Sequence, residues 1–221
     1  MSILAMPNGS SGHTEKVTEA LPIVQCGAPI LRRPAEPLDP AALRSRSIRR
    51  LIEAMRATMD EAPGIGLAAP QIGEPIRLAV LQDGPERWGD APAEDLAARE
   101  RTALDFTVLA NPVVTVVEQR RASFFEGCLS VPGLAGVVAR HRVVRVDALD
   151  ERGEPRTLTL RGWPARIVQH EVDHLNGVLY VDRVETRSIT TTPNLAELWM
   201  GRPTSEAAAA LGFDLVDEAA S

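Results

Sequence analysis

Apolar residues recur every three or four positions in the segment that begins at Ser47. Ile48, Leu51, Ile52, Met55 and Met59 carry this pattern. The spacing places them on one face and predicts an amphipathic helix that ends between residues 60 and 64. A second helix is predicted from about Pro164 to Asn176, since proline suits a first helical turn and the following glycine suits a helix end.

Strand-like stretches lie between these two helices. They are "IRLAVLQD", "FTVLANPVVTVVEQ", "GVVARHRVVRVDALD" and "PRTLTLRG", the last two joined by a turn at "ERGE", while "VLYVDRV" after the second helix is a further candidate. The strands form a block with hairpin-length connections, and a helix follows them. This order favours an α+β fold with antiparallel β-sheet over alternating βαβ units.

Composition divides the chain into three parts. Residues 1–20 are polar and are expected to form a flexible N-terminal extension. Residues 21–200 are expected to form a single domain, in which the polar stretch 84–101 is a surface excursion with a short helix. Residues 201–221 are an Ala-rich acidic tail that either frays or forms a peripheral helix.

Charge and hydropathy restrict the partners. The 221 residues carry a net charge of −6 without a run of Lys and Arg, so direct nucleic-acid binding is not expected. No apolar run reaches the roughly 18 residues that span a bilayer, and the N-terminus lacks the features of a signal peptide. We therefore expect a cytoplasmic protein without membrane contact, whose two cysteines, Cys26 and Cys128, are not joined in a disulfide.

The stretch "QHEVDHLNG" carries the clearest chemistry. His170 and His174 are one helical turn apart on the same face, with Glu171 beside them, and this H-E-x-x-H pattern is typical of a catalytic metal site. A third protein ligand is required, and no histidine follows His174. The residues alone leave two candidates: Glu197 downstream, as in zinc endopeptidases, and Cys128 upstream in "FFEGCLSVPG".

A third segment, "GIGLAAPQIG", contains two glycines and Gln71, whose amide can both donate and accept a hydrogen bond. Together, "GIGLAAPQ", "EGCLS" and "QHEVDH" resemble the three motifs of the bacterial peptide deformylases, in the same order. The resemblance spans roughly residues 20–185. It implies antiparallel sheet packed around the central metal-binding helix. It also implies Cys128, His170 and His174 as ligands of one divalent ion, with Fe²⁺ favoured and Zn²⁺, Ni²⁺ or Co²⁺ compatible.

The resemblance implies removal of the formyl group from N-formylmethionyl nascent peptides, close to the ribosome. By this resemblance the metal would activate a water toward the formyl carbonyl, with Glu171 expected as general base and acid. The Gln71 amide and the Leu129 N–H are expected to stabilise the oxyanion. Glu126 is expected to pair with Arg140. The residues expected at the substrate are Gly64, Ile65, Gly66, Phe124, Glu126, Gly127, Trp163 and Ile167. The alternative is a zinc endopeptidase that uses Glu197 as its third ligand.

Overall fold

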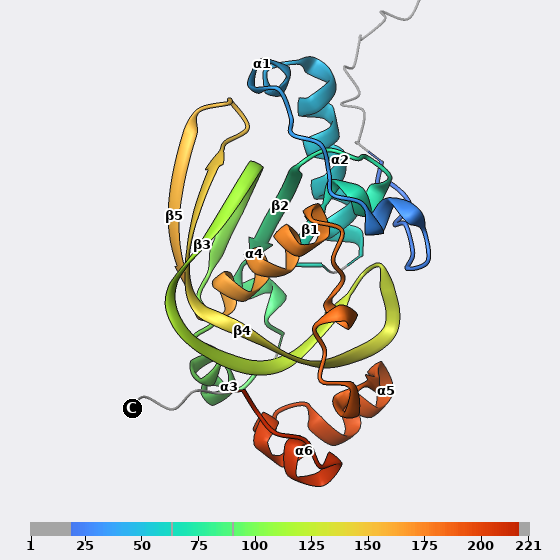
Figure 1. The fold of residues 1–221 in the computed structure, drawn as a ribbon, viewed down its shortest axis with the longest axis vertical. Helices are drawn as coiled ribbons and strands as arrows, with labels where there is room; N and C mark the ends of the chain where they lie inside the picture. Colours follow the sequence, from blue (N-terminus) through green and yellow to red (C-terminus); the bar gives the residue numbers. More distant parts are fainter. Residues whose placement is uncertain (1–18, 63, 90, 217–221) are drawn as a thin grey trace, which may run out of the picture.

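One antiparallel sheet dominates the computed structural model, which describes residues 19–62, 64–89 and 91–216 (Figure 1). Its strands lie in the order of the sequence, β1 to β5, and each pairs with the next. A short sixth strand pairs with β4. The strands are β1 Gly66–Ala68, β2 Leu78–Asp83, β3 Leu104–Cys128, β4 Val131–Leu149, β5 Pro155–Arg161 and β6 Thr190–Thr191.

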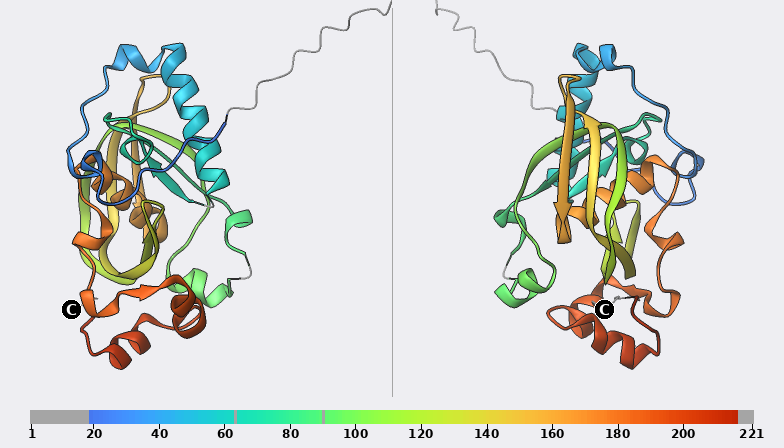
Figure 2. Two further views of the ribbon diagram at one scale, coloured as in Figure 1. Left: turned by 90° about the vertical axis from the view of Figure 1, so that its right-hand side faces the viewer. Right: turned by 60° about the vertical axis from the view of Figure 1, so that its left-hand side comes forward.

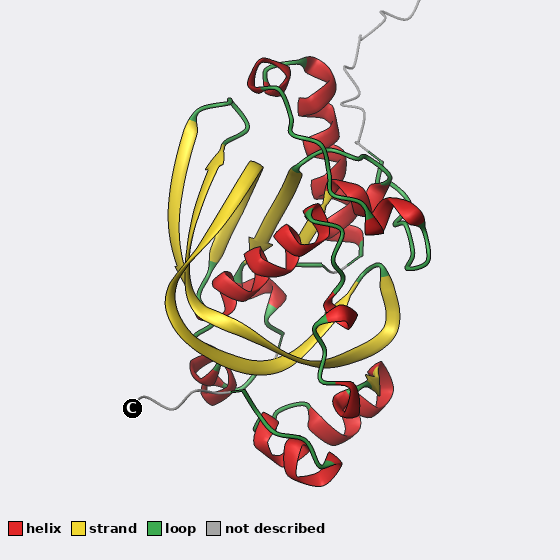
Figure 3. Cartoon of the chain, in the orientation of Figure 1, coloured by secondary structure: helices red, strands yellow, loops and turns green. Residues whose placement is uncertain are grey.

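Strands β3 and β4 form a hairpin far longer than an ordinary strand pair, with 25 and 19 residues. Their register shifts several times, between Ala110 and Val113, then on both sides of Glu118, and again at the tip before Cys128. Such bulges bend the strands and increase their twist. As a result the hairpin curves around the rest of the fold, as the broad yellow arc in Figure 3 shows.

Helix α4 (Gly162–Leu175) lies in the concave side of this curved sheet (Figure 1). Strand β5 runs directly into it through Gly162, which has a φ of +61° and where a Cβ would come within 2.6 Å of the Glu100 carbonyl oxygen. Only glycine fits this turn without strain. Eleven of the fourteen α4 residues are buried, so the helix is a core element and not a surface one.

The other helices lie at the two ends of the molecule (Figure 2). α1 (Pro40–Leu43) and α2 (Arg46–Glu61) lie at one end, and the Ser45 hydroxyl caps α2 by accepting the Ile48 N–H. At the opposite end are α3 (Ala93–Ala98), α5 (Thr192–Asn194) and α6 (Thr204–Leu211). Met55 and Met59 of α2 are fully buried against β2, so the predicted apolar face is the packed one.

Most predicted elements are confirmed, and two details differ. The second helix begins at Gly162 and not at Pro164. "VLYVDRV" is not a strand: Tyr180–Asp182 forms a 3₁₀ turn in which Asp182 accepts the Leu179 N–H. The apolar side chains of Leu179 and Tyr180 are instead buried against Leu31 and the β3–β4 hairpin, so packing and not strand pairing holds this segment.

The predicted ends of the chain fall only partly within the structure. Residues 1–18 and 217–221 lie outside the described residues. Of the predicted acidic tail, Thr204–Leu211 is the peripheral helix α6. Throughout residues 19–62, 64–89 and 91–216, no helix combines the length and apolar character needed to cross a membrane.

Candidate active site

The end of strand β3 and the middle of helix α4 bring one thiol and two imidazoles together. One ligand atom each from Cys128, His170 and His174 lies within 4.8 Å of the others. The Cys128 Sγ is 3.2 Å from His174 Nε2. A thiolate and two imidazoles converging from rigid elements are the donor set that Zn²⁺, Fe²⁺ and related divalent ions take, so the residues fit one such ion.

Helix geometry explains why two of these groups come from one element. His170 and His174 are four residues apart and face the same side, with Glu171 between them. Burial and the charge of His170 hold the pKa of His174 well below its ordinary value, so its imidazole is neutral, the form that binds a metal. The buried His174 Nδ1 has no hydrogen-bond partner in the described part of the chain.

A buried charge network orients His170. Its Nδ1 lies 3.0 Å from Glu126 Oε2, which leaves Nε2 facing the other two ligands. Glu126 accepts two hydrogen bonds from Arg140, at 2.9 and 3.0 Å, and one from Arg166 at 2.6 Å. Although burial opposes ionisation, Arg140 and these hydrogen bonds hold the pKa of Glu126 well below its usual range. The predicted Glu126–Arg140 pair is therefore confirmed.

Gln71 lies beside the thiol. Its Oε1 accepts the Ala68 N–H at 2.8 Å, which fixes the amide so that Nε2 points toward Cys128 Sγ, 3.6 Å away, and the Ser130 hydroxyl, 3.2 Å away. The side chain is 2% exposed. The motif "GIGLAAPQ" thus delivers a rigid N–H donor to the group of three ligands, and Ala68 takes part through its backbone.

Glu171 is buried, and its Oε2 has no hydrogen-bond partner among the described residues. A Cβ on Gly66 would come within 2.3 Å of the Glu171 Oε1, so the carboxylate lies directly over that glycine. Burial raises the pKa of Glu171 to about 7, from an ordinary value near 4.5, and the charge of His170 partly opposes this rise. A carboxyl group with a pKa near 7 can take and give a proton at neutral pH.

Cys128, His170, Glu171 and Gln71 line one cavity of about 520 Å³, a volume suited to a small ligand or a short peptide. Its walls include most residues expected at the substrate: Gly64, Ile65, Gly66, Glu126, Gly127, Trp163 and Ile167, together with Leu129. Phe124 does not line it. It packs against Trp163, with ring centroids 6.1 Å apart, and Phe125 lines the cavity instead, because successive strand residues face opposite sides.

Three arginines at this cavity were not predicted from the sequence. Arg166 is buried in α4 and also donates to the Val138 carbonyl at 2.8 Å. Arg87 donates to the Gly64 carbonyl at 2.7 Å, and Arg101 pairs with the fully buried Asp83. The excursion 84–101 thus returns to the cavity rim. The one sequence signal for Arg166 was its charge, which interrupts the apolar pattern of α4.

Glu197 does not join the ligand group. It is exposed on a π-helical turn, Leu195–Trp199, and among the described residues only Cys128, His170 and His174 form a group that could hold a metal. The geometry therefore favours Cys128 over Glu197 as the third ligand. Cys26 and Cys128 are both free thiols.

The raised pKa of Glu171 predicts a pH-dependent stability in the metal-free protein. The folded state favours the protonated acid, so stability from this group is present below about pH 4.5 and is lost as pH rises through about 7. The free energy of unfolding falls by about 3 kcal/mol over this pH range. Glu171→Gln should therefore unfold at higher urea than the parent at pH 8, and this advantage should disappear at pH 4. Equal advantages at both pH values would contradict the assigned pKa.

Comparisons with known proteins agree with this geometry. Residues 20–189 match the family model described as polypeptide deformylase. Peptide deformylase 1 of Streptomyces coelicolor is 50% identical over 200 residues, covering 90% of this chain and 89% of its own length. Peptide deformylase 3 of Streptomyces avermitilis is 52% identical over 198 residues, with 89% and 86% covered.

The fold also matches solved structures. The Met-Ala-Ser-bound class I type b peptide deformylase from Acinetobacter baumannii has a TM-score of 0.67 and 38% identity. The match covers 76% of this chain and 99% of that one.

Proposed function

This chain belongs to the polypeptide deformylase family, and from that premise we propose the residues through which it removes the formyl group from the N-terminal methionine of new peptides. One observation carries the assignment. The three motif segments meet at one cavity, where the ligand atoms of Cys128, His170 and His174 lie within 4.8 Å of one another, beside a buried Glu171 carboxylate and the Gln71 amide. The two Streptomyces relatives named above carry the name of the same enzyme.

Cys128, His170 and His174 would hold one divalent ion. A bound divalent ion lowers the pKa of water toward neutrality and polarises a carbonyl. For the physiological ion we propose Fe²⁺; the donor set is equally compatible with Zn²⁺, Ni²⁺ and Co²⁺. Glu126, held by Arg140 and Arg166, orients His170 for this role.

Glu171 handles the proton in the proposed reaction. Its carboxylate takes a proton from the attacking water as the C–O bond forms at the formyl carbon. It then gives that proton to the methionine nitrogen as the C–N bond breaks, which releases formate and a free N-terminus. Burial of the carboxylate beside the ligand group, with no hydrogen-bond partner for Oε2 among the described residues, leaves it free for both transfers.

Gln71 and Leu129 would stabilise the negative charge on the formyl oxygen. The Gln71 Nε2 is fixed near the thiol by the hydrogen bond of its Oε1, and Leu129 follows Cys128 directly at the same cavity. Trp163, Ile65 and Ile167 supply apolar surface for the methionine side chain. Gly64 and Gly66 give an extended peptide backbone room to approach.

Loss of the Gln71 donor should slow the reaction without removing the metal. An oxyanion donor contributes typically a hundredfold or more in rate, so Gln71→Leu should lower kcat by about 100-fold. Metal content, measured by atomic emission, should stay at the parent level. The exposed Gln119→Leu, outside the cavity lining, serves as control and should keep parental kcat. A Gln71→Leu variant with normal turnover would remove Gln71 from the mechanism.

The activity is tested by formate release from formyl-Met-Ala-Ser with protein purified without oxygen. Turnover is expected with the bound metal and should stop when a chelator removes it. Fe²⁺-loaded protein should lose activity in air faster than Zn²⁺-loaded protein, because iron beside a thiolate is prone to oxidation. A metal-loaded protein that releases no formate would contradict the proposed site.

We also propose that the protein works in the cytoplasm, in transient proximity to the ribosome, where formylated chains emerge. The substrate class supports this location. The net charge of −6 favours contact with the nascent peptide over direct binding of RNA. The proposal is tested by cell fractionation, which measures how the protein divides between translating ribosomes and free cytosol.

A further inference from the structure

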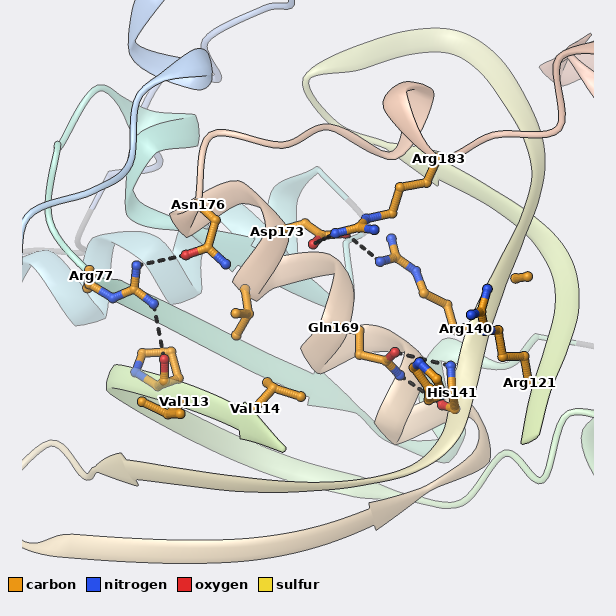
Figure 4. A pocket seen from close by; sticks show the side chains of 13 residues that line it. Arg77, Val113, Val114, Arg121, Arg140, His141, Gln169, Asp173, Asn176 and Arg183 are labelled. Atoms are coloured by element: carbon orange, nitrogen blue, oxygen red, sulfur yellow. Dashed lines mark hydrogen bonds and ion pairs between the residues drawn. The ribbon is translucent and has the colours of Figure 1, made fainter. Parts of the chain in front are cut away.

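A second cavity, of about 500 Å³, lies beside α4 (Figure 4), and none of the three candidate metal ligands lines it. On the helix, Gln169, Val172, Asp173 and Asn176 recur at three and four residues and line this cavity. The stripe that carries His170 and His174 lies about 120° further around the helix. Strands β3 and β4 supply most of the remaining wall, so the cavity is separated from the candidate active site by the helix itself.

Positive charge dominates this second cavity, which we call the arginine pocket. Its lining residues include four arginines, Arg77, Arg121, Arg140 and Arg183, whereas Asp173 is the one acidic residue among them. Asp173 is already shared, since Arg140 donates to its Oδ2 and Arg183 binds both of its oxygens at 2.7 and 2.8 Å. This excess of arginine is local, because the chain as a whole has a charge of −6.

Two of these guanidinium groups have no carboxylate partner among the described residues. Arg77 is partly buried and donates only to neutral oxygens: Leu175 O at 3.2 Å, Asn176 Oδ1 at 2.9 Å and Pro112 O at 3.1 Å. Burial lowers its pKa, which shows that its charge is poorly compensated there. Arg121 is exposed and forms no ion pair within the described ranges. Leaving a partly buried cation without a counter-ion costs free energy.

Shape and charge together indicate the chemistry of a ligand. Figure 4 shows Arg77 at one end of the pocket and Arg121, Arg140 and Arg183 toward the other, with Val113 and Val114 between them. A guanidinium group fits phosphate oxygens in a bidentate arrangement. The pocket volume lies in the range of small-molecule sites. The valines offer apolar surface, and Val113 is 60% exposed.

We propose that the arginine pocket binds a small phosphate monoester, with the phosphate at the end lined by Arg121, Arg140 and Arg183 and an apolar or ring-shaped body against Val113, Val114 and Val172. The phosphate supplies the counter-charge that Arg121 lacks. This site is distinct from the deformylase centre. A free phosphate ester is favoured over RNA as the source of the phosphate, because the net negative charge of the chain repels a polyanion.

Isothermal titration calorimetry of the metal-loaded protein at low ionic strength tests the proposal, with adenosine 5′-monophosphate as probe and adenosine as its uncharged counterpart. One saturable site is expected for the monophosphate, and adenosine should bind at least about tenfold more weakly. Saturation with Met-Ala-Ser should leave the Kd within about twofold, because the peptide occupies the other side of α4.

Arg121→Gln should weaken binding of the monophosphate about tenfold, as expected for loss of one charge-assisted contact. This variant should fold normally, since Arg121 is exposed and unpaired within the described residues. Arg50→Gln is the matched control. It removes an exposed arginine of α2 that has no ion pair within the described residues and does not line the pocket, and it should change the Kd by less than about twofold.

Four outcomes would overturn the proposal. Displacement of the monophosphate by Met-Ala-Ser would place it at the metal centre. Equal losses of affinity in Arg121→Gln and Arg50→Gln would show that binding depends on the overall charge and not on this pocket. Absence of saturable binding up to about 10 mM would leave the pocket without this ligand class. Single-stranded RNA that binds at least about 100-fold more tightly than the monophosphate, with the same dependence on Arg121, would assign the phosphate to RNA.

Discussion

Replacing Glu171 with glutamine should lower kcat for formyl-Met-Ala-Ser by about 10³- to 10⁴-fold. Glutamine has nearly the same shape but can neither take a proton from water nor deliver one to the leaving nitrogen. The carboxylate has no substitute nearby, because Glu126 is engaged by two arginines and His170. KM should change by only a few-fold, since Glu171 acts in the transition state and contributes little to ground-state binding.

The measurement is formate release at equal metal content for parent and variant. The exposed Glu197→Gln serves as control and should retain parental kcat. Metal content must be determined for each protein, so that loss of a proton carrier is separated from loss of the ion. A Glu171→Gln variant that keeps kcat within tenfold of the parent would show that another group moves the proton.

Replacing Cys128 with alanine should remove both the metal and the activity. A catalytic site of this kind needs three protein ligands, and the two histidines alone cannot retain the ion. We expect metal affinity to fall by more than about 100-fold, since even loss of a group behind the ligands costs 10- to 100-fold. Formate release should then fall below detection when the variant is assayed without added metal.

Cys26→Ala provides a matched control for this experiment. It removes the other cysteine, which is exposed and outside the ligand group, so metal content and activity should be unchanged. Glu197→Ala tests the endopeptidase alternative directly and should also keep the metal. If Glu197→Ala lost the metal while Cys128→Ala retained it, the ligand assignment and the proposed mechanism would both be wrong.

A buried ion network behind the metal ligands explains why the Glu171 and Cys128 variants should affect the active site and not the arginine pocket. Glu126 connects His170 to Arg140 and Arg166, and Arg140 continues to Asp173 on the opposite side of α4. The helix therefore carries the metal ligands on one side and one wall of the arginine pocket on the other, with a buried ion network between them. Variants at Glu171 or Cys128 leave this network intact, whereas variants at Glu126 would disturb both sides.

Features that depend on local spacing could be predicted from the order of the amino acids. The three- and four-residue periodicity identified α2, and the H-E-x-x-H spacing placed His170, Glu171 and His174 together on α4. Both follow from helix geometry, which relates residues a few positions apart. The strand block likewise predicted an antiparallel sheet. The ion pair of Glu126 with Arg140 was expected only through the family resemblance, and the structure places these groups across the β3–β4 hairpin.

Features that depend on contacts between distant segments were set by the three-dimensional fold. It brought Cys128 to the histidines and left Glu197 at the surface, a choice that the residues alone could not make. It placed Arg87 and Arg166 at the cavity and moved Phe124 behind Trp163. The bend of the long hairpin sets these positions. Its curvature arises from register shifts between β3 and β4, which no periodicity along a single strand encodes.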